Sequence, residues 1–157
     1  MKTVLIAIGK TDDKYLTHAI EDYTSRASHY ASIELKIIPD IKDVKNLSQD
    51  QQKEREGSLI IKQLQPGDYL VLLDEGGTEF TSNKFAQWLQ QKMSTVNKRL
   101  VFVIGGPYGF SKEVYSVAHA KISLSQMTFS HQMVRLIFVE QYYRALSILN
   151  NRPYHHN

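Results

Sequence analysis

Three short apolar runs place the tightest limit on how this chain can fold. They lie at Thr3–Gly9, Tyr69–Leu73 and Leu100–Ile104, and each passes directly into glycine or acidic residues. Apolar runs of this length, without an alternating polar side, are typical of strands buried on both faces, although a buried helix segment can look alike. Their flanking turns favour strands. The sequence therefore predicts an α/β fold with a mostly parallel sheet covered by helices.

Stretches with helical spacing fill the intervals between these runs, as crossovers between parallel strands require. Ser48 and Gln51 predict a capping box at the start of one helix, which Pro66 and Gly67 end. Two shorter strands are expected at 33–38 and 121–124. No linker or repeat interrupts the pattern, so residues 1–157 are expected to form a single domain. The expected helices cover 12–30, 48–65, 82–93, 111–119 and 130–150, and 40–47 is expected to be a mobile surface loop.

The composition excludes several kinds of chemistry. The chain has no cysteine, so disulfides, thiolate metal sites and cysteine nucleophiles are excluded. The apolar start is too short for a membrane span and has no signal-peptide cleavage site. We expect a cytoplasmic protein that needs neither metal nor membrane. The net charge of +3 permits an RNA partner but is shared by many enzymes.

The last predicted helix is apolar around most of its circumference. A helix of this kind must be covered on both sides. A second subunit is one natural cover, which predicts a homodimer, and a central place in the core of one chain is the alternative. The residues concerned are Val134, Leu136, Ile137, Phe138, Val139, Tyr142, Tyr143, Leu146, Ile148 and Leu149.

Three loops follow the carboxyl ends of predicted strands, where open α/β sheets bind ligands. They are Asp74–Gly77, Gly105–Phe110 and Ser125–Phe129. The second has glycines at 105, 106 and 109 that let backbone N–H groups approach a ligand, although a structural turn explains them equally well. It matches neither a dinucleotide fingerprint nor a P-loop. The third could hold an adenine through main-chain hydrogen bonds or simply connect a strand to a helix.

Taken together, these motifs resemble the RlmH family, bacterial methyltransferases of large-subunit ribosomal RNA that belong to the SPOUT class. The resemblance spans the whole chain and is densest in its C-terminal half. The matching stretches are Leu72-Leu73-Asp74-Glu75-x-Gly77, Phe102-Val103-Ile104-Gly105-Gly106-x-x-Gly109, Ser123-Leu124-Ser125-x-Met127-Thr128-x-x-His131-x-x-x-Arg135, Glu140-Gln141-x-Tyr143-Arg144-Ala145 and Pro153-Tyr154-His155.

The resemblance implies a SPOUT fold with a C-terminal trefoil knot, a homodimer, and S-adenosylmethionine bound in the knot. It also implies methylation at N3 of a pseudouridine in 23S ribosomal RNA within assembled ribosomes. One departure is that the chain ends in His155-His156-Asn157, where a basic residue is expected after the first histidine. The implied cofactor residues are Leu73, Gly105, Gly106, Gly109, Leu124, Ser125, Gln126, Met127, Thr128 and Phe129.

The chemistry of the implied acceptor suggests roles for further residues. An imide nitrogen is a poor nucleophile until its proton leaves, so a general base is expected. His155 is the first candidate, followed by His131, expected in the first turn of the last helix, and by Glu140. Tyr154 is a candidate for stacking on the base, or only anchors the tail.

Arg135 and Arg144 are candidates for holding RNA phosphates, or only neutralise Glu140. Two other functions stay open. One is a SPOUT methyltransferase that acts on transfer RNA, and the other is a non-catalytic nucleotide- or RNA-binding module. Transfer of a radioactive methyl group to ribosomes or to transfer RNA would separate the three.

Overall fold

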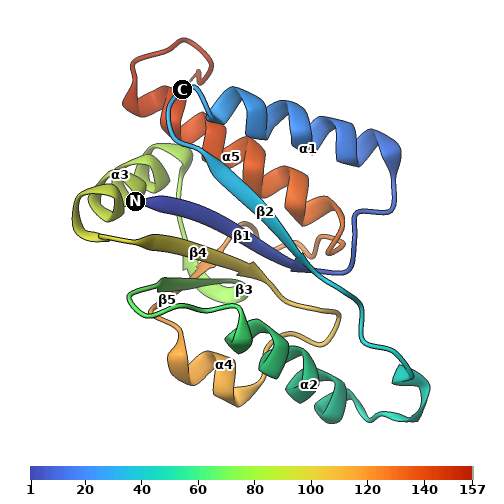
Figure 1. The fold of residues 1–157 in the computed structure, drawn as a ribbon. Helices are drawn as coiled ribbons and strands as arrows, with labels where there is room; N and C mark the ends of the chain where they lie inside the picture. The colour runs from blue at the N-terminus through green and yellow to red at the C-terminus, as the bar shows by residue number, and fades with distance from the viewer. Residues whose placement is uncertain (157) are drawn as a thin grey trace.

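The computed structural model describes residues 1–156 and contains one five-stranded sheet, in which every strand pair is parallel (Figure 1). The spatial order is β2-β1-β4-β3-β5, so the prediction of an α/β fold with a parallel sheet is confirmed. The strand order does not decide whether the chain is knotted, and the trefoil knot stays a prediction. The strands are β1 (Lys2–Ile8), β2 (Ile33–Ile38), β3 (Tyr69–Glu79), β4 (Arg99–Ile104) and β5 (Ala120–Ser123).

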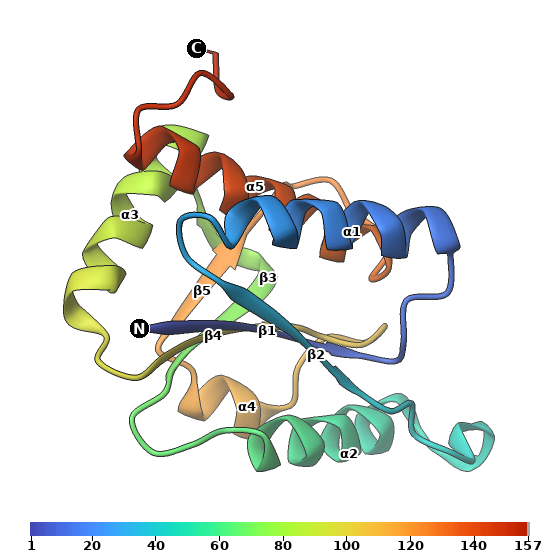
Figure 2. The same ribbon diagram turned by 45° about the horizontal axis from the view of Figure 1, so that its top comes forward.

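Helices cover both faces of this sheet. The helices α1, α3 and α5 lie on one face, and α2 and α4 lie on the other (Figures 1 and 2). Within the described part of the chain, no helix combines the length and apolarity needed to cross a lipid bilayer. The helices are α1 (Lys14–Ala27), the 3-10 turn η1 (Val44–Asn46), α2 (Gln49–Lys62), α3 (Ser82–Thr95), α4 (Lys112–Val117) and α5 (Met133–Leu149).

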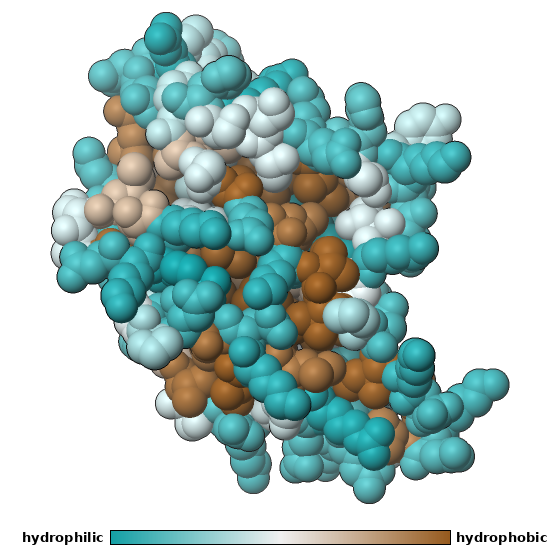
Figure 3. All heavy atoms as spheres, in the orientation of Figure 1, coloured by the Kyte–Doolittle hydropathy of each residue, from teal (hydrophilic) through white to brown (hydrophobic). Residues whose placement is uncertain are grey.

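The central strands contribute side chains to two separate hydrophobic cores, one on each face of the sheet. In β4, Leu100 and Phe102 belong to the core under α1, α3 and α5, whereas Val101 and Val103 belong to the core over α2 and α4. Successive side chains of a strand point to opposite faces, so both faces must be apolar when both are covered. This explains why these strands appear as continuous apolar runs. On the face in Figure 3, apolar atoms gather in the band between the α1/α5 layer and α2, where the edge strand β2 runs.

Most predicted boundaries agree with the structure to within a few residues. The capping box of Ser48 and Gln51 is present at the start of α2. One prediction was wrong: the stretch 74–77 is not a loop after β3, because the strand continues through it to Glu79 with a break in register between Leu73 and Thr78. A Cβ atom at Gly77 would lie 2.6 Å from the backbone of β5, so only glycine permits this pairing.

Helix α5 is covered largely by its own chain. Phe138, Val139 and Tyr142 are each at most 1% exposed and pack in the core with α1 and α3. For these residues the second alternative, a central place in the core of one chain, is correct, and they are not available to a partner subunit. Leu136 and Leu149 are half-buried and leave apolar surface at the outside of the helix. The homodimer therefore stays a prediction that the apolar circumference alone does not require.

Candidate active site

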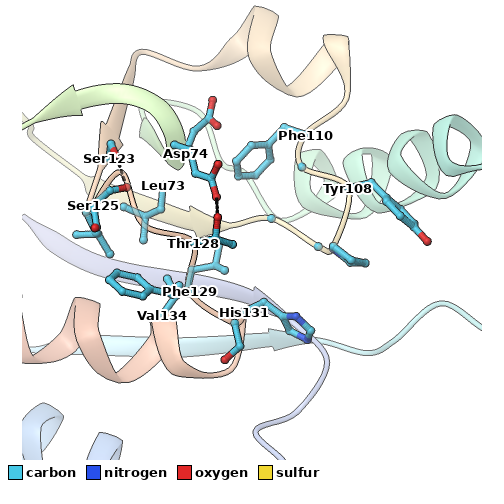
Figure 4. A pocket seen from close by; sticks show the side chains of 18 of the residues that line it. Leu73, Asp74, Tyr108, Phe110, Ser123, Ser125, Thr128, Phe129, His131 and Val134 are labelled. Carbon is cyan, nitrogen blue, oxygen red and sulfur yellow. Dashed lines mark hydrogen bonds between the residues drawn. The ribbon is translucent and has the colours of Figure 1, made fainter.

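The three expected loops meet at the carboxyl edge of the sheet and enclose one cavity (Figure 4). Its volume is about 550 Å³, which is typical of small-molecule sites. The cavity is lined by the ends of β3, β4 and β5 and by the segment that leads into α5. Its walls include Leu73, Gly105, Gly106, Gly109, Leu124, Ser125, Met127, Thr128, Phe129 and His131. Among the expected cofactor residues, Gln126 is the exception: its side chain is exposed and it is not among the lining residues.

The glycine segment forms a tight turn at the end of β4. The N–H of Gly109 donates to the carbonyl of Gly106 over 3.2 Å, and Gly109 has a φ of +83°, which favours glycine. A Cβ atom at Gly105 would press against the ring of Phe110 at 3.2 Å. A Cβ atom at Gly106 would meet the carboxylate of Glu56 on α2 at 2.4 Å. Gly105 and Gly106 thus let the turn lie close to Phe110 and Glu56 behind the cavity wall, and Gly109 permits the backbone conformation of the turn.

The segment after β5 is ordered by its own polar side chains. Ser123 Oγ donates to the Ser125 carbonyl over 3.0 Å, and the Met127 N–H donates to Ser125 Oγ over 2.9 Å. Thr128 Oγ1 donates to Glu75 Oε1 over 3.1 Å, which ties the segment to the irregular part of β3 (Figure 4). These contacts give the 123–129 segment a fixed shape, with apolar side chains and peptide groups both available at the cavity.

Tyr115 on α4 completes one wall and was not identified from the sequence. Its hydroxyl donates to Asp74 Oδ2 over 2.9 Å. Burial and this hydrogen bond to a carboxylate raise the pKa of Tyr115 to about 12. The phenol therefore stays protonated at neutral pH and holds Asp74 in place. The only signal in the sequence was the position of Tyr115 on the helix directly after the glycine turn.

Arg135 was a candidate for RNA contact, and this prediction was wrong. The residue is 0% exposed, and its guanidinium donates to the carbonyl of Ile8 at 2.9 Å, to Thr11 Oγ1 at 3.1 Å and to the carbonyl of His131 at 3.2 Å. It joins the end of β1 to the start of α5 from inside the protein. Since every contact is internal, Arg135 presents no surface to a phosphate.

His131 lies at the edge of the cavity and is exposed. Helix α5 begins at Met133, so His131 belongs to the turn before the helix and not to its first turn. The neighbouring Gln132 fixes this turn. Its amide donates to the Lys10 carbonyl over 3.2 Å and accepts the Asp12 N–H over 3.0 Å.

The C-terminal tail folds back on α5 and α1, away from the cavity. Tyr154 OH donates to Glu140 Oε1 over 2.8 Å and lies 3.0 Å from Tyr23 OH. Arg144 forms an ion pair with Glu140, contacts His155 Nδ1 at 3.0 Å and stacks over the Tyr154 ring. Burial and hydrogen bonds to Tyr23 and Glu140 raise the pKa of Tyr154.

Neither Tyr154, His155 nor Arg144 lines the cavity of its own chain. Within this chain, Arg144 pairs with Glu140 and Tyr154 anchors the tail. These are the structural roles that were the alternatives to RNA contact and base stacking. The expectation for the tail extends to Asn157, which lies outside the described residues.

The comparisons with known proteins agree with this arrangement. A family model described as "Predicted SPOUT methyltransferase" matches residues 1–155. The chain belongs to the SPOUT methyltransferase family. This methyltransferase is 67% identical over 156 residues to a protein of Parabacteroides distasonis named ribosomal RNA large subunit methyltransferase H, with 99% of each chain covered. Proteins of the same name from Bacteroides fragilis and Flavobacterium johnsoniae are 59% and 60% identical over the same share.

A solved structure supports the fold of the methyltransferase. It is titled a probable methylase family protein from Haemophilus influenzae and matches with a TM-score of 0.50 at 13% identity. The match covers 95% of this chain and 66% of the solved one. Among residues 1–156, no group of three or more histidine, aspartate or glutamate side chains is placed to hold a metal ion. Membership of this methyltransferase family implies the use of a methyl donor, for which the cavity is the candidate site.

Proposed function

We propose that this methyltransferase uses S-adenosylmethionine to methylate N3 of a pseudouridine in large-subunit ribosomal RNA, as a cytoplasmic homodimer acting on the ribosome. The observation that carries the proposal is that one cavity is lined by the three segments that the family motifs occupy: the irregular part of β3, the glycine turn after β4 and the segment after β5. The relatives named as large-subunit ribosomal RNA methyltransferases support the choice of RNA.

The residues of the cavity fit this methyl donor. Leu73, Leu124 and Phe129 offer apolar surface for an adenine ring, and the glycines of the turn offer backbone that no side chain of their own covers. Bound there, S-adenosylmethionine would supply an electrophilic methyl group on a sulfonium. The chain then has to align the acceptor nitrogen with that methyl group and exclude competing water.

A homodimer would complete the site. Tyr154 and His155 belong to the tail motif that resembles the family, and Arg144 of α5 contacts both, yet all three lie outside the cavity of their own chain. We propose that the tail of each subunit reaches the cavity of its partner. The exposed apolar side chains near the cavity, Met127 and Tyr108, give a partner or an RNA base surface to cover.

The hydrogen bonds of His155 change its proposed role. Arg144 can only donate, so Nδ1 of His155 accepts, and the neutral ring carries its hydrogen on Nε2. With this lone pair occupied, His155 can accept a proton at Nδ1 only if the contact with Arg144 opens. We therefore assign the general base to His131, which lies at the cavity. His155 and Tyr154 then orient the acceptor base.

The experiment is methyl transfer from radiolabelled S-adenosylmethionine to three acceptors: ribosomal particles, a free stem-loop of the same RNA, and transfer RNA. We expect labelling of the particles only, because a net charge of +3 gives little attraction to free RNA. Labelling of transfer RNA would favour the other SPOUT function, and binding of the donor without any transfer would favour a non-catalytic module. Mass spectrometry of the labelled RNA then identifies the nucleotide.

A further inference from the structure

A buried acidic side chain lies directly behind the cavity wall. Glu56 of α2 is 4% exposed, although its helix otherwise presents charged residues to solvent. Its carboxylate oxygens lie 2.4 and 2.6 Å from the position of a Cβ atom on Gly106, which places them within about 4 Å of the Gly106 Cα. Gly106 lines the cavity, so one peptide backbone separates this carboxylate from a bound ligand.

The carboxylate has little to balance its charge. Oε2 accepts one hydrogen bond from Gln52 Nε2 over 3.3 Å, and Oε1 has no hydrogen-bond partner among the described residues. A buried carboxylate without a cation is strongly unfavourable. Burial raises the pKa of Glu56, the hydrogen bond from Gln52 lowers it, Asp40 raises it further, and His131 lowers it.

A cation in the cavity would supply the missing charge. Gly106 has no side chain of its own between Glu56 and the cavity, so the carboxylate lies close behind this part of the wall. In a region of low polarity, charges several ångströms apart still interact appreciably. The methyl donor carries a positive sulfonium, whereas its demethylated product carries a neutral thioether at the same atom.

We propose that Glu56 determines the charge specificity of the cavity, holding the cationic methyl donor more tightly than the neutral product. This inference rests on the proposed use of S-adenosylmethionine. Glu56 acts across the backbone of Gly106 and makes no contact with the reacting atoms. The attraction ends when the methyl group is transferred, because the sulfur then loses its charge, and release of the product is favoured.

Calorimetry with three ligands tests the proposal in the Glu56→Gln variant. S-adenosylmethionine and sinefungin carry a cation at or beside the reacting position, and S-adenosylhomocysteine does not. In this variant we expect the affinities for S-adenosylmethionine and sinefungin to fall about tenfold relative to the affinity for S-adenosylhomocysteine. Glu54→Gln on the same helix is the matched control: it removes the same charge from an exposed position and should leave all three affinities unchanged.

An equal loss for all three ligands would overturn the proposal, since it would mean that Glu56 only supports the glycine turn. If the unaltered protein bound none of the three ligands, the proposed function itself would fail. These two failures are therefore distinguishable.

If Glu56→Gln does not fold, the pH dependence of the unaltered protein gives the same answer. The ratio of donor to product affinity should fall as the pH falls and Glu56 takes up a proton. Asp40 and His131 are the titratable groups that face Glu56. Ser111 and Val114, at the N-cap and in the first turn of α4, pack on the adjacent Gly57 and do not titrate. Repeating the series with His131→Asn and Asp40→Asn separates their contributions. A ratio that does not change with pH in any of these proteins would refute the role of Glu56.

Discussion

A buried ion pair at the end of the sheet opposite to the cavity should carry much of the stability of the central strands. Arg99, at the start of β4, donates to Asp68 through Nε at 2.9 Å and Nη2 at 2.7 Å, and to the carbonyl of Gln63 at 3.0 Å. The two side chains are only 10% and 4% exposed. Replacing Asp68 by asparagine keeps the volume and leaves the guanidinium buried without its counter-charge.

Loss of one partner from a buried, hydrogen-bonded pair costs about 3–5 kcal/mol. For an m value of about 2 kcal/mol/M, Asp68→Asn should lower the midpoint of urea unfolding by roughly 1.5 M or more. The fluorescence of Trp88, which stacks on Phe85 and packs near Phe102, reports the transition. All variants are measured at the same protein concentration, so that any self-association contributes equally to each midpoint.

The pH dependence provides a second test of the same pair. Burial by itself raises the pKa of Asp68, but the hydrogen bonds from Arg99 and the Gln65 N–H, with the nearby positive charges, lower it overall. Its contribution is therefore fully present above the unfolded pKa of about 3.9 and is lost as the pH falls through the lower folded value. The difference in free energy of unfolding between the unaltered protein and Asp68→Asn should therefore become smaller as the pH falls below about 3.9.

The exposed pair of Lys2 and Glu34 is the control, with side chains 58% and 52% exposed. Glu34→Gln should change the free energy of unfolding by less than about 1 kcal/mol. If Asp68→Asn also cost less than that, the pair would behave as a surface ion pair and the argument from burial would be refuted. A double-mutant cycle with Arg99→Met measures their coupling directly.

Three further changes test the site. Gly106→Ala should destabilise the protein by about 1–3 kcal/mol in thermal melts, because the new methyl group meets Glu56, and the additional change Glu56→Ala should recover part of the loss. Arg135→Met should cost at least about 2 kcal/mol, since the Ile8 carbonyl loses its buried donor, and unchanged urea unfolding would contradict this. Deletion of Pro153–Asn157 should abolish methyl transfer but preserve donor binding. Gly106→Val should weaken donor binding, because its side chain would displace the cavity wall from Glu56. Heterodimers of one tail-deleted chain and one Gly106→Val chain should regain activity only if the two subunits share their sites.

The sequence alone determined the strands except for the second half of β3, most of the helices and the three cavity segments. The runs at 3–9, 69–73 and 100–104 have no polar side because both faces of the sheet are covered, so local composition carried the information. Ser48 and Gln51 marked a helix start because a capping box involves only neighbouring residues. The three segments were predicted to meet because carboxyl ends of parallel strands share one edge.

Only the tertiary structure decided what individual side chains do. Arg135 appeared to be available for RNA, but its partners Ile8 and Thr11 lie more than 120 residues away in the chain. Glu56 follows helical spacing with Ile60, and nothing local indicates that the backbone of Gly106 lies against its carboxylate. Periodicity reports which way a side chain faces within its own element. The group that it meets depends on how distant elements pack, and that group determines whether a charge is exposed, paired or buried.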